Sequence, residues 1–338
     1  MSKVPCIAIV GATGAVGREI LTVLSQRDFP LGNLRLLASH RSMGTVISWR
    51  GTTYTVEKLG EESFDGVDIV FFSAGASISQ RYAPIAVSRG CLVVDNSSAF
   101  RMNIDTPLVV PEVNPHALVD HSRLIAVPNC STILLCVAIW PLHQRAKIKR
   151  ILVSTYQAAS GAGAIAMAEL AQQARDWVAE EPITKQFFGR QYIFNVFCHE
   201  SKMDQSSGYN NEELKMAEET RKIFGNECLE IAATCVRVPV LRAHSQAVYL
   251  TFENPISVEE SRSILKRAPG VEVLDDREKN QHPEPILASH EDPVLVGRIR
   301  QDLSRSDGKG LALFLAGDQL RKGAALNAVQ IAEAVLKG

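Results

Sequence analysis

The chain has 338 residues, of which 46% are hydrophobic and 22% charged, a composition typical of a folded globular protein with room for about two domains. A formal net charge of -1 excludes the broad basic surface that attracts nucleic acids and anionic membranes. The seven cysteines include no CxxC pair, which argues against a disulfide framework and a zinc ribbon, and we expect no metal site.

The beginning of the chain and its apolar regions show no sign of export or membrane insertion. Strand-like residues begin at Cys6, which leaves no room for a secretory signal. The longest apolar region, residues 124–140, is interrupted by Pro128 and Asn129 and is not a convincing membrane span. We therefore expect a cytoplasmic protein in a reducing compartment.

Strand-like and helix-like segments alternate over the first 130 residues. The predicted strands are residues 6–10, 34–38, 69–72 and 92–95, and the predicted helices are residues 17–26 and 79–89. Strands that alternate with helices form a parallel sheet that is covered on both faces. We therefore predict an α/β fold with an N-terminal, doubly wound domain of the Rossmann type.

The pattern becomes less regular after Trp140 and indicates a second, α+β domain. Its predicted elements are strands at residues 150–157 and 247–252 and helices at residues 162–178 and 211–224. Residues 275–292 are polar and contain prolines, which predicts an exposed loop region.

These elements divide the chain into a nucleotide-binding domain, residues 1–129, and a second domain, residues 130–319. The tail at residues 324–336 has the pattern of an amphipathic helix. We expect the segment 320–338 to pack back onto the first domain.

A glycine-rich turn follows the first predicted strand and opens the first predicted helix. Its residues are Gly11-Ala12-Thr13-Gly14-Ala15-Val16-Gly17. The glycines permit a tight turn, and the start of the helix presents N–H groups to a pyrophosphate. Because the spacing differs from G-x-G-x-x-G, an ordinary strand-to-helix turn remains the alternative.

The end of the second predicted strand indicates which dinucleotide is bound. Enzymes that use NAD usually carry an acidic residue there, which binds the ribose hydroxyls. Here the strand leads into Ser39-His40-Arg41-Ser42, and hydroxyls with a guanidinium suit the 2′-phosphate of NADP. We expect NADP(H) as the cofactor, with a solvated turn as the alternative.

Cys130 lies at the start of an apolar run, within the sequence Val127-Pro128-Asn129-Cys130-Ser131-Thr132. If the run, residues 133–140, is a buried helix, Cys130 sits at its amino end. Unpaired N–H groups and the helix dipole favour a thiolate there. A thiolate in a nucleotide-binding protein points to covalent redox chemistry, and the alternative is a small cysteine of the core.

A nucleophilic cysteine needs an acid/base partner. Of the eight histidines, only His244 lies in a run rich in functional side chains, residues 237–245, although a packed histidine is the alternative. Arg237 opens this run in an apolar strand. A buried guanidinium is unfavourable without a partner, so Arg237 should face a ligand or an acid. Residues 157–163 place the Gln157 amide and a run of small residues right after a strand, in a turn that a flat ring can approach closely, and a flexible loop is an equal alternative.

Several motifs in order along the chain resemble those of the aspartate-β-semialdehyde dehydrogenases. They are GATGAVG at 11–17, SAFR at 98–101, PNCST at 128–132, QAASGAG at 157–163, NEELK at 211–215, RVPVLRAH at 237–244 and LRKGAALN at 320–327. The match covers nearly the whole chain. It implies a homodimer with an N-terminal Rossmann domain and a C-terminal catalytic and dimerisation domain. It also implies a role in the biosynthesis of lysine (through diaminopimelate), threonine, methionine and isoleucine.

The resemblance implies the reaction as well. L-aspartyl 4-phosphate acylates Cys130 with release of phosphate, and NADPH reduces the thioester to L-aspartate 4-semialdehyde, in a reversible sequence. His244 would act as the acid/base, and together with the helix start it would favour the thiolate. Gln157 would position the substrate and the acyl group, with Asn129 close by.

The resemblance further implies how the substrate is bound. Arg237 would bind its α-carboxylate and Glu212 its α-ammonium group, while Arg101 and Lys215 would bind the phosphate. By themselves, Arg101 and Lys215 could equally be solvated cations. Glu212 and Lys215 could equally be a surface helix pair worth about 0.2–0.5 kcal/mol.

By the same resemblance, the residues that bind NADP(H) come from both domains. They are Gly11, Thr13, Gly14, Ala15, Val16, Ser39, Arg41, Ser42, Ser160, Gly161 and Gln319. Gln319 stands where many family members carry asparagine. Because it keeps a side-chain amide, we expect the cofactor contact to survive.

Other functions share parts of this pattern. An acyl-phosphate reductase of the N-acetyl-glutamyl-phosphate type has the same fold and also uses a cysteine with a histidine. It lacks the arrangement of Glu212 with Lys215 and of Arg237 with His244. Glyceraldehyde-3-phosphate dehydrogenase is disfavoured because its SCTT-like motif is absent. The presence of Cys130 and His244 argues against an inert NADP-binding regulator, and a cysteine hydrolase has no use for a nicotinamide-binding fold.

Overall fold

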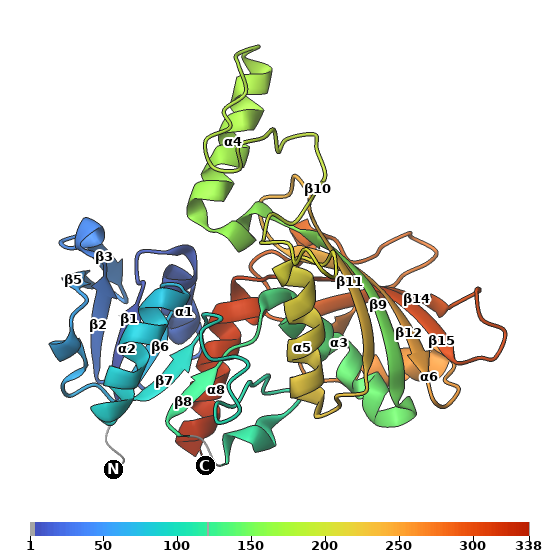
Figure 1. Cartoon of the computed structure of the whole chain (residues 1–338), viewed down its shortest axis with the longest axis horizontal. Coiled ribbons are helices and arrows are strands. Elements are labelled where there is room, and N and C mark those ends of the chain that lie inside the picture. The colour runs from blue at the N-terminus through green and yellow to red at the C-terminus, as the bar shows by residue number, and fades with distance from the viewer. Residues whose placement is uncertain (1–3, 120–121, 338) are drawn as a thin grey trace. The chain divides into compact units, whose positions relative to one another are not determined.

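The protein is described by a computed structural model that covers residues 4–119 and 122–337 (Figure 1). The chain forms two compact units: one contains the residues up to Asn129 together with those from Ala324 onward, and the other contains Cys130–Gly323. Every helix in the described part of the chain is too short or too polar to cross a membrane.

The first unit is built on a six-stranded sheet in the order β5-β2-β1-β6-β7-β8, with every adjacent pair parallel. The strands are β1 (Cys6–Val10), β2 (Asn33–Ala38), β5 (Glu57–Lys58), β6 (Ile69–Phe72), β7 (Leu92–Asp95) and β8 (Leu124–Ala126). All residues of β6 and β7 are buried, as parallel strands with two covered faces require. The predicted Rossmann-type domain is confirmed. The hairpin of β3 (Val46–Trp49) and β4 (Thr52–Thr55) and the short β5 and β8 lie outside the predicted strands.

In the described residues of the first unit, the α-helices are α1 (Ala15–Gln26), α2 (Ala76–Ser88) and α8 (Leu326–Lys337). Helix α2 contacts β6 and β7, and α8 contacts β7 and α1. Both Nε and Nη2 of Arg27 donate to the carboxylate of Glu333 across 2.6 Å, which ties α1 to α8. The C-terminal helix is therefore an integral part of this unit.

The second unit contains a seven-stranded mixed sheet in the order β10-β11-β9-β12-β15-β14-β13. The strands are β9 (Ile148–Gln157), β10 (Phe197–Cys198), β11 (Glu230–Arg237), β12 (His244–Phe252), β13 (Val271–Val273), β14 (Val294–Gln301) and β15 (Gly310–Gly317). Strand β9 pairs in parallel with β11 and antiparallel with β12. Buried and exposed residues alternate along much of β9, so one face of the sheet is covered and the other is exposed.

The helices of the second unit are α3 (Cys130–Ala146), α4 (Ala164–Val178), α5 (Asn211–Phe224), α6 (Val258–Leu265) and α7 (Pro285–Ala288). Helix α3 contacts β9, β12, β14 and β15 and lies against both α5 and α6. Helix α4 stands away from the sheet (Figure 1). These elements confirm the predicted α+β character of the second domain.

Two predictions for this unit need correction. The helix predicted at 162–178 begins at Ala164, because Gly163 has a φ of +93° and ends the preceding 3-10 turn. The region 275–292 is largely exposed, as predicted, at residues 277–281, 284, 286–287 and 290–291, but it contains the helix α7 and is anchored by buried residues. The Asp275 carboxylate, only 1% exposed, accepts the N–H groups of Arg298 and Ile299.

Candidate active site

The glycine turn of the first unit has the shape that a dinucleotide requires. Gly11 has a φ of +88°, and a Cβ there would lie 2.8 Å from the carbonyl oxygen of Ser73. A Cβ on Gly17 would lie 2.3 Å from the carbonyl oxygen of Gly11. Gly14 is the extended, exposed residue before α1, and the first turn of α1, which starts with Ala15 and Val16, contains no acidic residue. The start of α1 therefore suits an anion such as a pyrophosphate.

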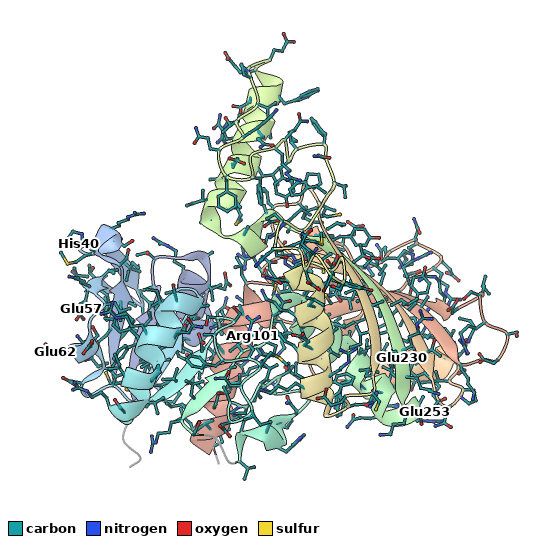
Figure 2. All side chains as sticks on the ribbon, in the orientation of Figure 1. His40, Glu57, Glu62, Arg101, Glu230 and Glu253 are labelled. Atoms are coloured by element: carbon teal, nitrogen blue, oxygen red, sulfur yellow. The ribbon has the colours of Figure 1, made fainter. Side chains whose placement is uncertain are left out.

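The turn after β2 lies beside the glycine turn. The hydroxyl of Thr13 donates to the hydroxyl of Ser42 across 3.3 Å, which links the two turns. Ser39 and Arg41 are exposed, and so is His40, which Figure 2 labels. The structure thus brings together the hydroxyls and the guanidinium that the sequence assigned to NADP.

Arg101 is buried and held by main-chain carbonyls of the first unit. Its Nε donates to the Val127 oxygen and its Nη2 to the Asn96 oxygen, both across 2.9 Å. Asn129, also buried, follows Val127 by two residues. Arg101 is therefore not a solvated cation, and its guanidinium is fixed next to the segment that leads to Cys130.

Cys130 is the first residue of α3, so the predicted position at the amino end of a buried helix is confirmed. Gly323 lies directly against it, since a Cβ at Gly323 would come within 2.9 Å of the Cys130 Cβ. Gln246 donates to the carbonyl oxygen of Ser131 across 2.8 Å. Gln246 and His244 are two residues apart on β12 and share a face, so this bond directs the start of α3 toward the side of the sheet that carries His244.

His244 is fully buried and forms one hydrogen bond, through Nδ1, which accepts the N–H of Ala158 across 3.0 Å. The ring proton is therefore on Nε2, which has no hydrogen-bond partner among the described residues. Gly161 covers this side of the ring, because a Cβ there would lie 3.0 Å from Nε2. Burial, followed by the charge of Arg237 and the proximity of His199, lowers the pKa of His244 well below its ordinary value.

A neutral His244 corrects one expectation. The sequence suggested that His244 and the helix start together favour the Cys130 thiolate. A ring that carries no positive charge does not stabilise an anion by its charge, so of the two groups named in that expectation the start of α3 is the one that favours the thiolate. His244 can instead act as a hydrogen-bond donor through its Nε2–H.

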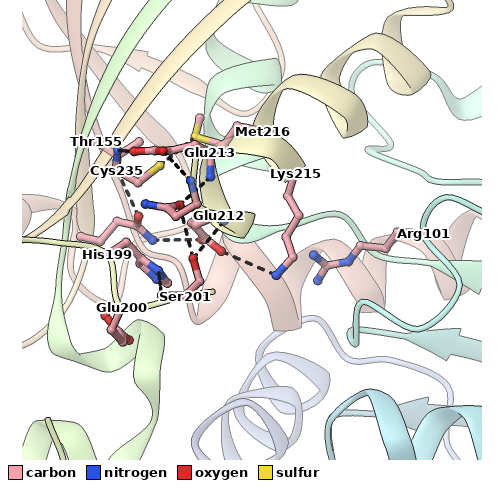
Figure 3. A network of polar contacts seen from close by, with 12 residues as sticks. Arg101, Thr155, His199, Glu200, Ser201, Glu212, Glu213, Lys215, Met216 and Cys235 are labelled. Atoms are coloured by element: carbon pink, nitrogen blue, oxygen red, sulfur yellow. Dashed lines mark hydrogen bonds and ion pairs between the residues drawn. The ribbon is translucent and has the colours of Figure 1, made fainter. Parts of the chain in front are cut away.

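Gln157, Glu212 and Lys215 form a connected chain of polar contacts in the second unit. Gln157, the last residue of β9, donates from Nε2 to Glu212 Oε1 across 3.2 Å and accepts the Thr155 hydroxyl across 3.1 Å. Glu212 is 6% exposed and lies 3.8 Å from the Lys215 Nζ (Figure 3). The Glu212 carboxylate of this pair is buried. The Glu212–Lys215 contact is therefore not the surface helix pair that the sequence left as an alternative.

Arg237, the last residue of β11, is buried next to Gln157 in the sheet register. Its Nε and Nη2 donate to the two carboxylate oxygens of Glu200 across 3.0 and 2.7 Å, and its Nη1 donates to the Ala158 oxygen across 3.2 Å. Its Nη2 also lies 2.9 Å from His199 Nε2. The prediction that Arg237 faces a ligand or an acid is confirmed, since it faces Glu200. Burial opposes its charge, but Glu200 raises the pKa of Arg237.

Three residues of this cluster are absent from the sequence prediction. Thr155 lies two residues before Gln157 on the same face of β9, a relationship that the strand pattern could have revealed. His199 and Glu200 follow β10, a strand of two residues that pairs Phe197 with Arg237. A strand this short leaves no periodic signal in the sequence.

Gln319 connects the turn at Ser160 to the strand that carries His244. Its Oε1 accepts the N–H of Ala243 across 2.9 Å, and its Nε2 donates to the Ser160 hydroxyl. Gly323, which lies against Cys130, also lies against the Cβ of Gln319. Ser160, Gly161 and Gln319 therefore line the same part of the second unit as Cys130 and His244.

Both parts of the chain match known family descriptions. Residues 6–121 match "Semialdehyde dehydrogenase, NAD binding domain", and residues 139–322 match "Semialdehyde dehydrogenase, dimerisation domain". The aspartate-semialdehyde dehydrogenase of Synechocystis sp. is 51% identical over 331 residues, which cover 98% of this chain and 97% of that protein.

Solved structures agree with these matches. Aspartate semialdehyde dehydrogenase II from Vibrio cholerae, complexed with ASA, is 41% identical, with a TM-score of 0.95 over 99% of each chain. The aspartate semialdehyde dehydrogenase from Candida albicans, solved with NADP, is 25% identical, with a TM-score of 0.74 over 99% of each chain. Full-length similarity of this kind favours this family over the other acyl-phosphate reductases and the inert regulator. The chain belongs to the aspartate-semialdehyde dehydrogenase family.

Proposed function

We propose that this enzyme reduces L-aspartyl 4-phosphate to L-aspartate 4-semialdehyde and phosphate with NADPH, reversibly, through a thioester on Cys130. The observation that supports this most directly is the composition of one cluster in the second unit. A neutral His244 and the buried Arg237 share the main chain of Ala158 as a hydrogen-bond partner, and Gln157 with Glu212 lies beside them. These groups suit a small amino-acid substrate with one carboxylate and one ammonium group.

NADP(H) is the proposed cofactor, bound by residues 1–129 together with the C-terminal helix and by the turn at Ser160 and Gly161. The uncapped start of α1 and the close-packed Gly11 support a pyrophosphate there, and Arg41 with Ser42 supports a 2′-phosphate. When bound, the nicotinamide supplies or accepts a hydride.

In the oxidative direction, the Cys130 thiolate adds to the aldehyde carbon, and the electron pair of the C=O bond moves to oxygen. The Nε2–H of His244 would donate a hydrogen bond to this oxygen, where negative charge develops. Loss of hydride from the same carbon, which the nicotinamide of NADP⁺ would accept when bound, leaves a thioester. Phosphate then attacks the thioester carbon, the C–S bond breaks, and the thiolate of Cys130 is restored.

Arg237 would bind the α-carboxylate of the substrate through a bidentate pair, and Glu212 would bind the α-ammonium group. Gln157 is held by Thr155 and Glu212, so its amide is fixed in one orientation for the acyl group. Arg101 and Lys215 would bind the phosphate, and Asn129 would lie near the thioester.

The proposed enzyme is a cytoplasmic homodimer of the aspartate-derived amino-acid pathway that leads to lysine, threonine, methionine and isoleucine. Residues 130–319 form its catalytic and dimerisation domain. The exposed face of the second sheet carries large apolar side chains, Leu152 and Tyr156 on β9 and Tyr249 on β12, which support a subunit contact. A reducing compartment keeps the Cys130 thiol available.

The test is an assay that depends on phosphate. Purified protein, mixed with L-aspartate semialdehyde and NADP⁺, should form NADPH only when phosphate or arsenate is present. Formation of NADPH at the same rate without either anion would contradict the proposed phosphate attack.

A further inference from the structure

We propose that Glu200 occupies, in the enzyme without substrate, the position on Arg237 that the α-carboxylate of the substrate takes, and that the substrate displaces it. This inference rests on the proposed role of Arg237 in substrate binding. It makes Glu200 a residue that determines substrate affinity, acting through Arg237 without touching the reacting atoms.

A guanidinium has two edges that can hold a carboxylate by two parallel hydrogen bonds. At the edge formed by Nη1 and Nη2, the Ala158 oxygen lies 3.2 Å from Nη1 and the His199 ring lies 2.9 Å from Nη2. The Ala158 carbonyl is held in place, because the N–H of the same peptide group, that of Ala159, donates to the Val240 oxygen across 2.8 Å. Only the edge formed by Nε and Nη2 can accept a carboxylate in a bidentate pair, and Glu200 holds that edge.

The two partners of this pair differ in exposure. The Arg237 side chain is 3% exposed, whereas the Glu200 side chain is 35% exposed and comes from the loop after β10. Glu200 can therefore turn toward water, while Arg237 stays in place. Burial opposes ionisation of Glu200, but the hydrogen bonds and charge of Arg237 lower its pKa, so it is an anion at neutral pH.

Glu200 stabilises the buried Arg237 side chain while no substrate is bound. A guanidinium that is shielded from water and left without an anion is strongly destabilising. Glu200 supplies the anion until the substrate brings one. The substrate must therefore compete with Glu200, and its apparent affinity is reduced in proportion to the fraction of molecules in which Arg237 is open.

Steady-state kinetics of Glu200→Gln test this inference. Glutamine keeps the side-chain length and one oxygen for Arg237, but it no longer competes as an anion. We expect the KM for L-aspartate semialdehyde to fall by about tenfold or more, because Arg237 would be open in no more than about a tenth of wild-type molecules. The kcat and the KM for phosphate should not change. Glu181→Gln removes an exposed carboxylate of the same unit and should leave every constant unchanged.

Glu200→Ala serves as a second variant, and thermal unfolding checks that both variants fold. A KM for the semialdehyde that is unchanged or raised in both folded variants would overturn the inference, because Glu200 would then simply hold Arg237 in place. A different result would contradict the proposed function itself. In that case the wild-type enzyme itself would form no NADPH from the semialdehyde and phosphate.

Discussion

The Nδ1 atom of His244 accepts the backbone N–H of Ala158 across 3.0 Å, and this contact fixes the ring proton on Nε2. The carbonyl oxygen of the same residue accepts a hydrogen bond from Arg237. One residue, which directly follows β9, thus contacts both His244 and Arg237, the proposed oxyanion donor and the proposed ligand of the substrate carboxylate. A neutral ring with a fixed N–H is suited to stabilise a developing oxyanion.

Replacement of His244 by Ala should lower kcat by about 10²–10³, because the hydrogen-bond donor to the tetrahedral oxygen is lost. The KM for the semialdehyde should change little. Stopped-flow or steady-state formation of NADPH measures both constants. Alkylation of Cys130 by iodoacetamide should continue at a similar rate, since the neutral ring does not create the thiolate. A kcat within about twofold of the wild type would remove His244 from the mechanism.

Cys130→Ala should abolish turnover, because no thioester can form, while NADPH still binds. The change removes only the sulfur atom from the first residue of α3. Fluorescence titration with NADPH should give a Kd close to that of the wild type. Full activity in this variant would refute covalent catalysis.

Arg41→Asp should discriminate between the two dinucleotides. Arg41 is exposed in the turn after β2, so its replacement does not disturb the core. Loss of a charge-assisted pair with the 2′-phosphate should weaken NADP use by about 10- to 100-fold and change NAD use much less. The ratio of kcat/KM for the two cofactors reports this, and equal losses would contradict the assignment of Arg41.

Gly17→Ala should destabilise the first unit by about 1–3 kcal/mol, because the new methyl group would overlap the backbone at Gly11. A Cβ at Gly14 would lie 3.3 Å from the same Gly11 oxygen, and Gly14 is exposed, so Gly14→Ala is the matched control. Differential scanning calorimetry should show a lowered transition for Gly17→Ala and a small change for Gly14→Ala. Equal transition temperatures for the two variants would contradict this prediction, because the backbone of the glycine turn would then have moved to make room for the methyl group.

Stability should decrease below about pH 6.5, where histidine in an unfolded chain takes up a proton. Burial lowers the pKa of His143, His199 and His244 in the folded protein, so these rings stay neutral there. The unfolded state then binds more protons, and each histidine reduces the free energy of unfolding by up to about 1.4 kcal/mol per pH unit as the pH falls toward its lowered native pKa. Above about pH 7 this contribution vanishes.

Thermal midpoints between pH 5 and 8 measure this dependence. His143→Gln, which lies outside the proposed active site, should reduce the slope below pH 6.5. A slope that His143→Gln leaves unchanged would show that this ring becomes protonated in the folded protein.

The strands that the sequence predicts well are those with continuous apolar runs. Strands β1, β6 and β7 occur at the predicted residues, because a buried parallel strand needs apolar side chains on both faces. The strands outside the prediction include short ones, such as β5 and β10, where only two residues pair. They also include β11, β14 and β15, which have eight residues each and lie inside the second sheet. The existence of the short strands depends on the neighbouring strand, which a local pattern does not contain.

The sequence by itself determined the Rossmann-type domain, the glycine turn and the position of Cys130 at a helix start, because each depends on residues that are adjacent in the chain. Only the tertiary structure decided that His244 is neutral and that Glu200 holds Arg237. Ala158 and His244 are 86 residues apart, and Glu200 and Arg237 are 37 apart. The state of a titratable group is set by burial and by the charges around it, and only the folded chain, through the strands and the turns that follow them, brings those groups together.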